Sequence, residues 1–500
     1  MTGFAEIAST RPSHPAVVDG ARITTYGELD ERAARLAHVL AEAGVEPGGR
    51  VGVMLGNSTE FMECLAASAK LGASCLTLNW HLRADEVAWI LDDSGAAALV
   101  THTELSPHVE AVTTARSLPV LWVGGDYEER VAAASPDPVA YRFPAPWPVL
   151  YTSGTSGRPK GVVHGALADP DVLAMAQDGL AAMWGYGPDD VHLLAGPLYH
   201  AGPAGYANIT LFVGGTVVLM GSWDAREFLR LVEAHRVTTT FLTPAHFIRI
   251  LEVPDDELGR YDLSSLRHVI HAGAPCPLGV KRRIIAALPD AEVWELYGMS
   301  EGGATRVSAA EWLERPGTVG RPWPGVDIRI LDPDNLDPVA VGEEGLVYVR
   351  PAYGRFEYHN DPAKTAATWL DDAFTVGDVG RLDDAGYLFL TDRLSDLIIR
   401  GGVNIYPRVV EEVLHTHPAV VDCAVFGAPD ERDGEVPVGV VEVRSTVTAE
   451  ALTAWCRERL DSYTCPVRID LVDTLPRDPN GKVLKRLLRD PAWADTGRRI

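Results

Sequence analysis

The sequence Tyr151-Thr-Ser-Gly-Thr-Ser-Gly-Arg-Pro-Lys-Gly-Val-Val-His164 gathers hydroxyls, glycines and a lysine in one short loop. Glycine lets backbone N–H groups approach an anion closely, and hydroxyls donate further hydrogen bonds. The ammonium of Lys160 would offset the charge of a bound polyphosphate. Apolar residues at 149–151 and 162–163 predict a strand before the loop and a second strand after it. The stretch is therefore a candidate phosphate-binding loop.

Two observations weigh against this interpretation. A Ser/Gly-rich run is most often a flexible surface linker, and the spacing Gly-x-x-Gly-x-x-Lys differs from the P-loop pattern. The scarcity of lysine argues the other way, since lysine occurs only six times among 44 basic residues, at positions 70, 160, 281, 364, 482 and 485. A lysine inside a glycine-rich loop then indicates a need for one compact, mobile charge. Lys160 and Lys482 both fit that description.

Length and composition indicate an ordinary globular protein with more than one domain. The chain has 500 residues, of which 46% are hydrophobic and 23% are charged. The net charge of −25 argues against nucleic acid as a partner, because phosphate backbones would be repelled. Without a signal-like start or a run long enough to span a bilayer, we expect a cytoplasmic protein with no membrane insertion. The six cysteines form no Cys-x-x-Cys pair, which predicts buried thiols.

The order of apolar runs predicts an α/β protein. Between residues 25 and 100, strand-like runs at 51–55 and 96–100 alternate with helical stretches at 29–43 and 59–71. Such alternation is typical of parallel strands joined by crossover helices. From residue 408 onward, shorter strands and helices alternate again, which predicts a smaller α+β unit.

Three further stretches place polar residues beside predicted strands. Tyr199 and His200 follow one strand, although a lone histidine is usually structural. In the stretch 293–303, Tyr297 offers an aromatic face, Ser300 a hydroxyl and Glu301 a hard oxygen ligand suited to magnesium. Near the C-terminus, the turn signal at 479–481 predicts that Lys482 lies at the mouth of a loop before a helix.

Together, these stretches resemble the adenylate-forming superfamily, which includes acyl-CoA synthetases, coumarate-CoA-ligase-like enzymes, luciferases and adenylation domains. The resemblance covers nearly the whole chain, and it favours the AMP-forming acyl-CoA synthetase branch. It implies a large N-terminal domain, residues 1–392, of parallel-type sheets with crossover helices and a β-subdomain. A small mobile α+β domain, residues 393–500, would carry the catalytic lysine and rotate between two half-reactions.

The resemblance also implies a role for each matched residue. Catalysis would involve Lys482, Glu301, Ser300 and His200, with Glu301 as the metal ligand and the hinge at Ser395. Residues that would bind ATP or coenzyme A are Thr152, Ser153, Gly154, Thr155, Ser156, Gly157, Lys160, Gly273, Ala274, Pro275, Glu295, Leu296, Tyr297, Gly298, Asp378, Arg393, Gly401 and Gly402. Residues that would line the acyl pocket are Tyr199, His200, Gly202, Tyr206, His246, Met299, Gly302 and Gly303.

Three positions set this chain apart within the superfamily. Ser300 stands where threonine is usual, and the hydroxyl is retained. Ser395 stands where relatives commonly have lysine or aspartate, so any charge at the hinge must be absent or replaced. Amino-acid-activating relatives carry an aspartate beside the aromatic residue at Tyr199, and His200 cannot supply that charge. Because the pocket candidates are small, aromatic or apolar, we expect an apolar or aromatic acid and not an α-amino acid.

The implied activity is AMP-forming ligation of a carboxylic acid to coenzyme A, with ATP and Mg²⁺. An alternative acceptor is the pantetheine of a carrier protein, and a catalytically silent nucleotide-binding protein or a luciferase-like oxygenase are further alternatives. Basic residues of the small domain could meet the phosphates of coenzyme A, although a solvated helix face explains at least half of them. These residues are Arg400, Arg408, Lys485, Arg486 and Arg489.

Overall fold

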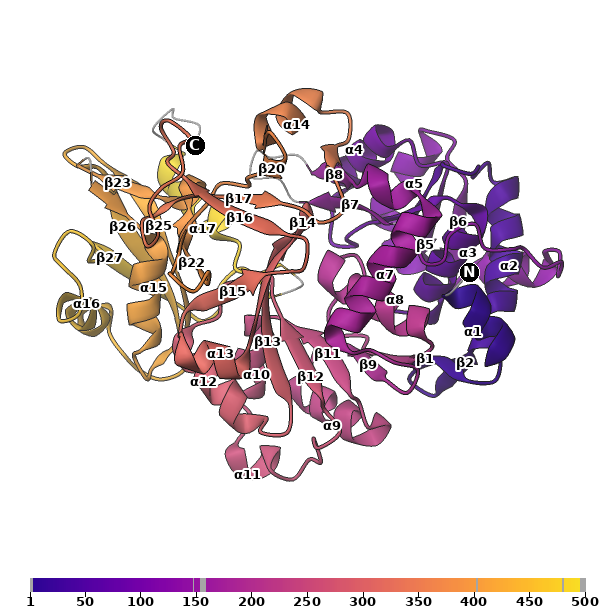
Figure 1. The fold of residues 1–500 in the computed structure, drawn as a ribbon, viewed down its shortest axis with the longest axis horizontal. Coiled ribbons are helices and arrows are strands. Elements are labelled where there is room, and N and C mark those ends of the chain that lie inside the picture. Colours follow the sequence, from indigo (N-terminus) through magenta and orange to yellow (C-terminus); the bar gives the residue numbers. More distant parts are fainter. Residues whose placement is uncertain (1–2, 147, 153–158, 402, 479–480, 495–500) are drawn as a thin grey trace.

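The computed structural model describes residues 3–146, 148–152, 159–401, 403–478 and 481–494. Their strands form three sheets of 15, 7 and 5 strands. Figure 1 shows helices packed around the first two sheets in the indigo to orange part of the chain, with the third sheet and its helices in the yellow part at the left. The predicted α/β class is confirmed. No helix in these described ranges is both long enough and apolar enough to cross a bilayer.

The seven-stranded sheet contains the two strands that flank the candidate phosphate loop in the sequence. Five neighbouring strands that reach one edge of the sheet are parallel, and the two pairings at the other edge are antiparallel. The strands are β3 (Arg50–Met54), β4 (Ser74–Thr77), β5 (Ala98–His102), β6 (Val120–Val123), β7 (Pro148–Thr152), β8 (Lys160–Val163) and β18 (Glu357–Tyr358). The two strands predicted before and after residues 153–158 are β7 and β8.

The 15-stranded sheet has a parallel part and an antiparallel part. The parallel part, edged by the antiparallel β2, consists of β1 (Pro15–Asp19), β2 (Arg22–Thr25), β9 (Val191–Leu194), β10 (Thr216–Leu219), β11 (Thr239–Leu242), β12 (His268–His271) and β13 (Glu292–Met299). The antiparallel part consists of β14 (Gly302–Ser308), β15 (Thr318–Pro322), β16 (Asp327–Leu331), β17 (Gly345–Arg350), β19 (Trp369–Leu370), β20 (Ala373–Phe374), β21 (Asp378–Leu382) and β22 (Leu388–Arg393). The hairpin from β13 to β14 joins the two parts.

Helices cover both sheets, and their ends follow local sequence signals. For example, α3 begins after Ser58, whose side-chain oxygen accepts a hydrogen bond from Phe61 N, and it ends at Gly72 with φ +70°. The helices are α1 (Phe4–Thr10), α2 (Tyr26–Glu42), α3 (Thr59–Leu71), α4 (Ala84–Ser94), α5 (Ser106–Thr114), α6 (Tyr127–Ala133), α7 (Pro170–Trp184), α8 (Ala201–Val213), α9 (Ala225–His235), α10 (Pro244–Ile250), α11 (Asp255–Leu258), α12 (Leu278–Ala287), α13 (Ala309–Glu314) and α14 (Pro362–Thr368).

The C-terminal unit has its own sheet and its own buried core. The strands are β23 (Ile398–Arg400), β24 (Val403–Ile405), β25 (Val420–Asp430), β26 (Gly434–Val443) and β27 (Arg468–Val472), and the helices are α15 (Pro407–His415), α16 (Ala449–Arg457) and α17 (Lys485–Trp493). A short 3₁₀ turn, Leu394–Asp396, links it to β22. Arg408 binds back to that strand, donating from Nη1 to Leu390 O at 2.9 Å.

Candidate functional site

The predicted ligand residues gather at the carboxyl ends of two parallel strands. Gly273, Ala274 and Pro275 follow β12, and Tyr297 lies near the end of β13. The chain then reverses at residues 300–301 before β14. The carboxyl ends of parallel strands are where open α/β sheets bind ligands. The fold therefore brings together stretches that are separated along the sequence.

Asp378 is held by two donors from different strands. Tyr297 OH donates to Oδ2 at 2.5 Å, and Arg393 Nε donates to Oδ1 at 2.8 Å. Asp378 is buried, and it faces Arg393 in the register of β21 with β22. Burial and then the Asp378 charge raise the pKa of Tyr297, so its hydroxyl remains a donor. Each carboxylate oxygen keeps a second lone pair, which can accept from ligand hydroxyls such as those of ribose.

The side chain of Glu295, a residue predicted to contact nucleotide, pairs with a buried lysine. Lys281 Nζ lies 3.0 Å from Glu295 Oε2 and 2.5 Å from His271 Nε2. The Lys281 side chain is fully buried, and that of Glu295 is 8% exposed. Burial and then the Lys281 charge hold the pKa of His271 well below its usual range, so the ring is neutral. The Glu295 carboxylate therefore fixes α12 against β12 and β13, beneath the segment predicted to meet adenine.

We expect Glu295→Gln to lower the free energy of unfolding by about 3 kcal/mol, because Lys281 would remain buried without a counter-ion. The double variant Lys281→Met/Glu295→Leu should recover most of that loss, since apolar replacement of a buried pair is often nearly neutral. Urea unfolding followed by tryptophan fluorescence measures both. A single variant as stable as the unaltered protein would contradict this account.

Glu301 lies in the turn between β13 and β14, and 8% of its surface is exposed. Tyr358 OH donates to Glu301 Oε1 at 2.7 Å. Among the described residues this bond engages one carboxylate oxygen, and the second is available for a hard cation such as Mg²⁺. His164 Nε2 lies 2.8 Å from the carbonyl oxygen of Ser300, which ties the end of the phosphate-loop hairpin to this turn.

Two lysines lie near this turn. Lys160 begins β8, and Lys364 in α14 places its Nζ 5.2 Å from the ring centre of Tyr358. The strand that carries Tyr358 pairs with β8, with Tyr358 opposite Val162. Burial and then the charge of Lys364 lower the pKa of Lys160 to about 8. Two like charges so placed disfavour each other, and a polyphosphate between them would relieve the repulsion.

Tyr358 and Lys364 were not among the predicted site residues. Their contribution depends on the pairing of β18 with β8, which joins segments far apart in the sequence. The scarcity of lysine was a usable signal for Lys364, because it is one of only six in the chain. No local motif singled out Tyr358.

The loop that carries Lys482 is closed by its own backbone and docks on the N-terminal part. Asp478 N donates to Lys482 O at 2.8 Å, and Lys482 N donates to Asp478 Oδ1 at 2.9 Å. Gly481, with φ +83°, lies so close to Ala245 that a Cβ there would overlap the alanine side chain. Lys482 is exposed. The protein around its ammonium displaces water, and this effect and then the Arg393 charge lower the pKa of Lys482. The charges of Asp478, Asp396 and Asp378 oppose this shift.

His200 and Tyr199 lie beside this docked loop. Burial lowers the pKa of His200, the Lys482 charge lowers it further, and the Asp478 charge opposes both, so the ring is neutral. Within the described residues, His200 Nε2 and Tyr199 OH are buried without a hydrogen-bond partner. Unpartnered buried polar atoms are costly unless a ligand or water satisfies them. These two atoms therefore mark a place where a polar ligand group fits.

The remaining pocket candidates separate into four groups. Gly202 leaves room for the ring of Phe241, and Gly303 does the same for Trp323. Tyr206 is buried in a cluster of aromatic rings, 5.3 Å from the Phe241 ring centre. His246 is buried in α10, where its Nδ1 accepts from Thr243 N at 3.0 Å and its ring lies 4.1 Å from that of Trp223. Met299 and Gly302 flank the turn itself.

Several predicted residues fall outside the described part of the chain. These are Ser153, Gly154, Thr155, Ser156 and Gly157 of the phosphate loop, Gly402, and the side chains of Thr152 and Ser395. Gly401 is described and lies with φ +55° at the turn after β23. Leu296 and Gly298 lie in β13.

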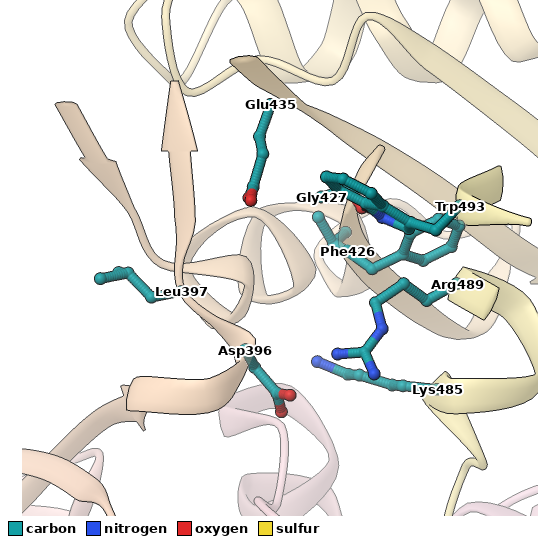
Figure 2. Close-up of a pocket in the computed structure, with 9 residues that line it drawn as sticks. Asp396, Leu397, Phe426, Gly427, Glu435, Lys485, Arg489 and Trp493 are labelled. Carbon is teal, nitrogen blue, oxygen red and sulfur yellow. Dashed lines mark hydrogen bonds between the residues drawn. The ribbon is translucent and has the colours of Figure 1, made fainter. Parts of the chain in front are cut away.

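Most of the small-domain cations already have partners. Arg400 Nε lies 2.9 Å from Asp433 Oδ2, Lys485 Nζ 2.7 Å from Glu411 Oε1, and Arg489 Nη2 3.6 Å from Asp490 Oδ1. Figure 2 shows the side chains of Lys485 and Arg489 side by side near Asp396, at a cavity of about 40 Å³. That volume is far below what a nucleotide needs. The ion pairs stabilise the small domain, and a contact of these cations with the phosphates of coenzyme A stays a prediction.

Family comparisons agree with this geometry. The model of the AMP-binding enzyme family matches residues 4–354, and that of the AMP-binding enzyme C-terminal domain matches residues 409–482. The chain belongs to the AMP-binding enzyme family. The resemblance to adenylate-forming enzymes is thereby confirmed, and the acyl-CoA synthetase branch is supported by its relatives.

Relatives of this AMP-binding enzyme are ligases of carboxylic acids. It is 35% identical to a fatty acid–[acyl-carrier-protein] ligase, ScoC, of Streptomyces coeruleorubidus, over 99% of this chain and 96% of that protein. It is 36% identical to a feruloyl-CoA synthase of Amycolatopsis, over 96% of each chain. The structure of o-succinylbenzoate coenzyme A synthetase of Bacillus subtilis with ATP and magnesium matches with a TM-score of 0.84 and 28% identity, over 97% of this chain and 98% of that one.

Proposed function

We propose that this enzyme joins an apolar or aromatic carboxylic acid to a pantetheine thiol in an AMP-forming reaction. The observation that carries the proposal is the docking of the Lys482 loop beside His200 and near the Asp378–Arg393 pair. In a protein that only bound nucleotide, Lys482 would not need to lie near His200, which we expect to border the acid. We also propose the division into domains at residues 1–392 and 393–500.

In the first step, an oxygen of the acid attacks the α-phosphorus of ATP, the bond to pyrophosphate breaks, and an acyl adenylate forms. The barrier is largely electrostatic, because an anion must approach a polyanion. Lys482 would lie between carboxylate and α-phosphate, with Ser300 donating to the latter. Lys160 and Lys364 would receive pyrophosphate, and Asp378 would accept from the ribose. Glu301 would hold a magnesium ion bound with ATP, and this ion would neutralise part of the phosphate charge.

In the second step, the thiol sulfur attacks the acyl carbonyl and AMP leaves with the bonding electron pair. We assign Lys482 no part in this step, and we propose that the small domain moves between the two steps. His200 and Tyr199 would border the acyl group, with His200 neutral. A neutral histidine offers no charge to an ammonium, which agrees with the exclusion of α-amino acids.

The thiol that accepts the acyl group is either free coenzyme A or the pantetheine of a carrier protein. The similarity to feruloyl-CoA synthase supports free coenzyme A as the acceptor, and the similarity to the acyl-carrier-protein ligase supports a carrier protein. We propose coenzyme A as the principal acceptor, with carrier-protein pantetheine as the alternative. A panel of carboxylic acids, screened first for ATP-dependent pyrophosphate release, followed by thioester formation with each acceptor, tests both. Absence of acid-dependent pyrophosphate release across short-chain, long-chain and aromatic acids would overturn the proposal.

The lowered pKa of Lys160 predicts a pH dependence of nucleotide binding. With a pKa of about 8, Lys160 is charged below pH 8 and loses its proton above it. The dissociation constant of a non-hydrolysable ATP analogue with Mg²⁺ should therefore rise about fivefold between pH 8 and pH 9. Lys160→Arg keeps its charge over this range and should flatten the profile. Equal profiles for both proteins would contradict the role of Lys160.

A further inference from the structure

An ion pair crosses from the small domain to the N-terminal part. Arg249 Nη2 in α10 lies 3.4 Å from Glu442 Oε1 in β26. Arg249 also pairs with Glu252 of its own part, 3.0 Å away. The arginine side chain is 39% exposed and that of Glu442 only 5%. Water therefore reaches Arg249, whereas Glu442 is buried in the small domain.

Glu442 is fixed because its second oxygen has partners within the small domain. Glu442 Oε2 accepts from Leu475 N at 3.1 Å and from Arg477 Nη2 at 3.2 Å. Arg477 also lies 2.7 Å from Asp422 Oδ2 and donates from Nη1 to Gly481 O at 3.0 Å. Gly481 immediately precedes Lys482. A continuous set of polar contacts therefore joins Arg249 to the backbone of the loop that carries Lys482.

The same helix receives both the Gly481 contact and the ion pair with Glu442. Ala245, in the first turn of α10, meets Gly481, and Arg249 lies four residues further along. Residues four apart lie on one face of a helix. One face of α10 therefore holds the small domain at two points, one apolar and one charged, with the Lys482 loop between α10 and Arg477.

We propose that Arg249 and Glu442 are positioning residues, which hold the small domain in the orientation that brings Lys482 to the acid and ATP. The inference rests on the proposed two-step reaction and adds that this pair must separate before the thiol step. A part-exposed pair suits that task, because such pairs are worth little and break readily. Loss of Arg249 leaves Glu442 bound to Arg477 and Leu475, so the small domain keeps its internal contacts.

Arg249→Ala should slow acid-dependent ATP–pyrophosphate exchange by about two- to fivefold. Thioester formation from supplied acyl adenylate should stay unchanged or become faster. Arg249→Glu, which opposes Glu442 with a like charge, should slow exchange further. The matched control is Arg226→Ala, because Arg226 pairs at 2.6 Å with Glu257 of the same part and should affect neither half-reaction. Equal slowing of both half-reactions, or of neither, by the Arg249 variants would overturn the inference.

A second measurement does not depend on activity. Amide hydrogen exchange of peptides spanning residues 243–250 and 476–484 should be about two- to fivefold faster in Arg249→Ala than in the unaltered protein or in Arg226→Ala. An unchanged rate of amide hydrogen exchange in Arg249→Ala would overturn the inference even if no acid substrate were found. If amide hydrogen exchange becomes faster as expected but no acid leads to consumption of ATP, the Arg249–Glu442 contact is supported and the proposed function fails. The two failures are therefore distinguishable.

Discussion

Lys482→Ala is expected to slow adenylation by about 100- to 1,000-fold, which is the usual cost of removing one donor aimed at developing charge. The lysine would neutralise two anions that repel each other, and no other lysine of the small domain is available for this, because Lys485 is paired with Glu411. ATP–pyrophosphate exchange measures this half-reaction. Thioester formation from supplied acyl adenylate should be nearly unaffected.

Two further variants sharpen this prediction. Lys482→Arg keeps a positive charge but replaces a compact ammonium with a planar fork, so partial activity is expected. Arg468→Ala removes an exposed cation from the same domain, one that lies 3.1 Å from Asp470, and should leave both half-reactions intact. Equal loss of both half-reactions in Lys482→Ala would show that the residue supports the fold or the acyl site rather than the first step.

Glu301→Gln should lower the rate of adenylation by about 100-fold and raise the magnesium concentration needed for half-maximal rate. The amide keeps the size of the side chain but removes the charge that a hard cation requires. Tyr358→Phe offers a matched comparison, because it removes only the hydroxyl that holds Glu301 Oε1 at 2.7 Å. We expect a smaller effect of about tenfold on magnesium affinity there.

Magnesium titrations of pyrophosphate exchange measure both variants. A normal magnesium requirement in Glu301→Gln, whatever its rate, would exclude Glu301 as the metal ligand. A larger effect of Tyr358→Phe than of Glu301→Gln would instead make the tyrosine hydroxyl the group that contacts the nucleotide.

The sequence was sufficient wherever local pattern determines structure. The helix predicted at 59–71 is α3, with a serine cap and a terminal glycine, and the strands predicted around 51–55 and 96–100 form β3 and β5 of one parallel sheet. Lys482 was expected just before a helix, and α17 starts three residues after it. These features depend on short-range signals that a single sequence displays.

Features that depend on long-range pairing were beyond such reasoning. The Glu295 carboxylate pairs with Lys281, and the burial of this lysine cannot be read from a helical stretch in which two arginines follow it directly. Lys364 and Tyr358 join the site only through the pairing of β18 with β8. His246 was expected in the pocket, and the structure shows its ring against Trp223 and its Nδ1 bound to the backbone of its own helix cap.

The most direct test of the central claim is acid-dependent exchange of labelled pyrophosphate into ATP without any thiol present. If the carboxylate attacks the α-phosphorus before a thiol is needed, exchange must appear with at least one acid from the panel. It must also be abolished by omitting the acid. Thioester formation accompanied by ADP and phosphate, with no pyrophosphate exchange in the absence of thiol, would contradict the account.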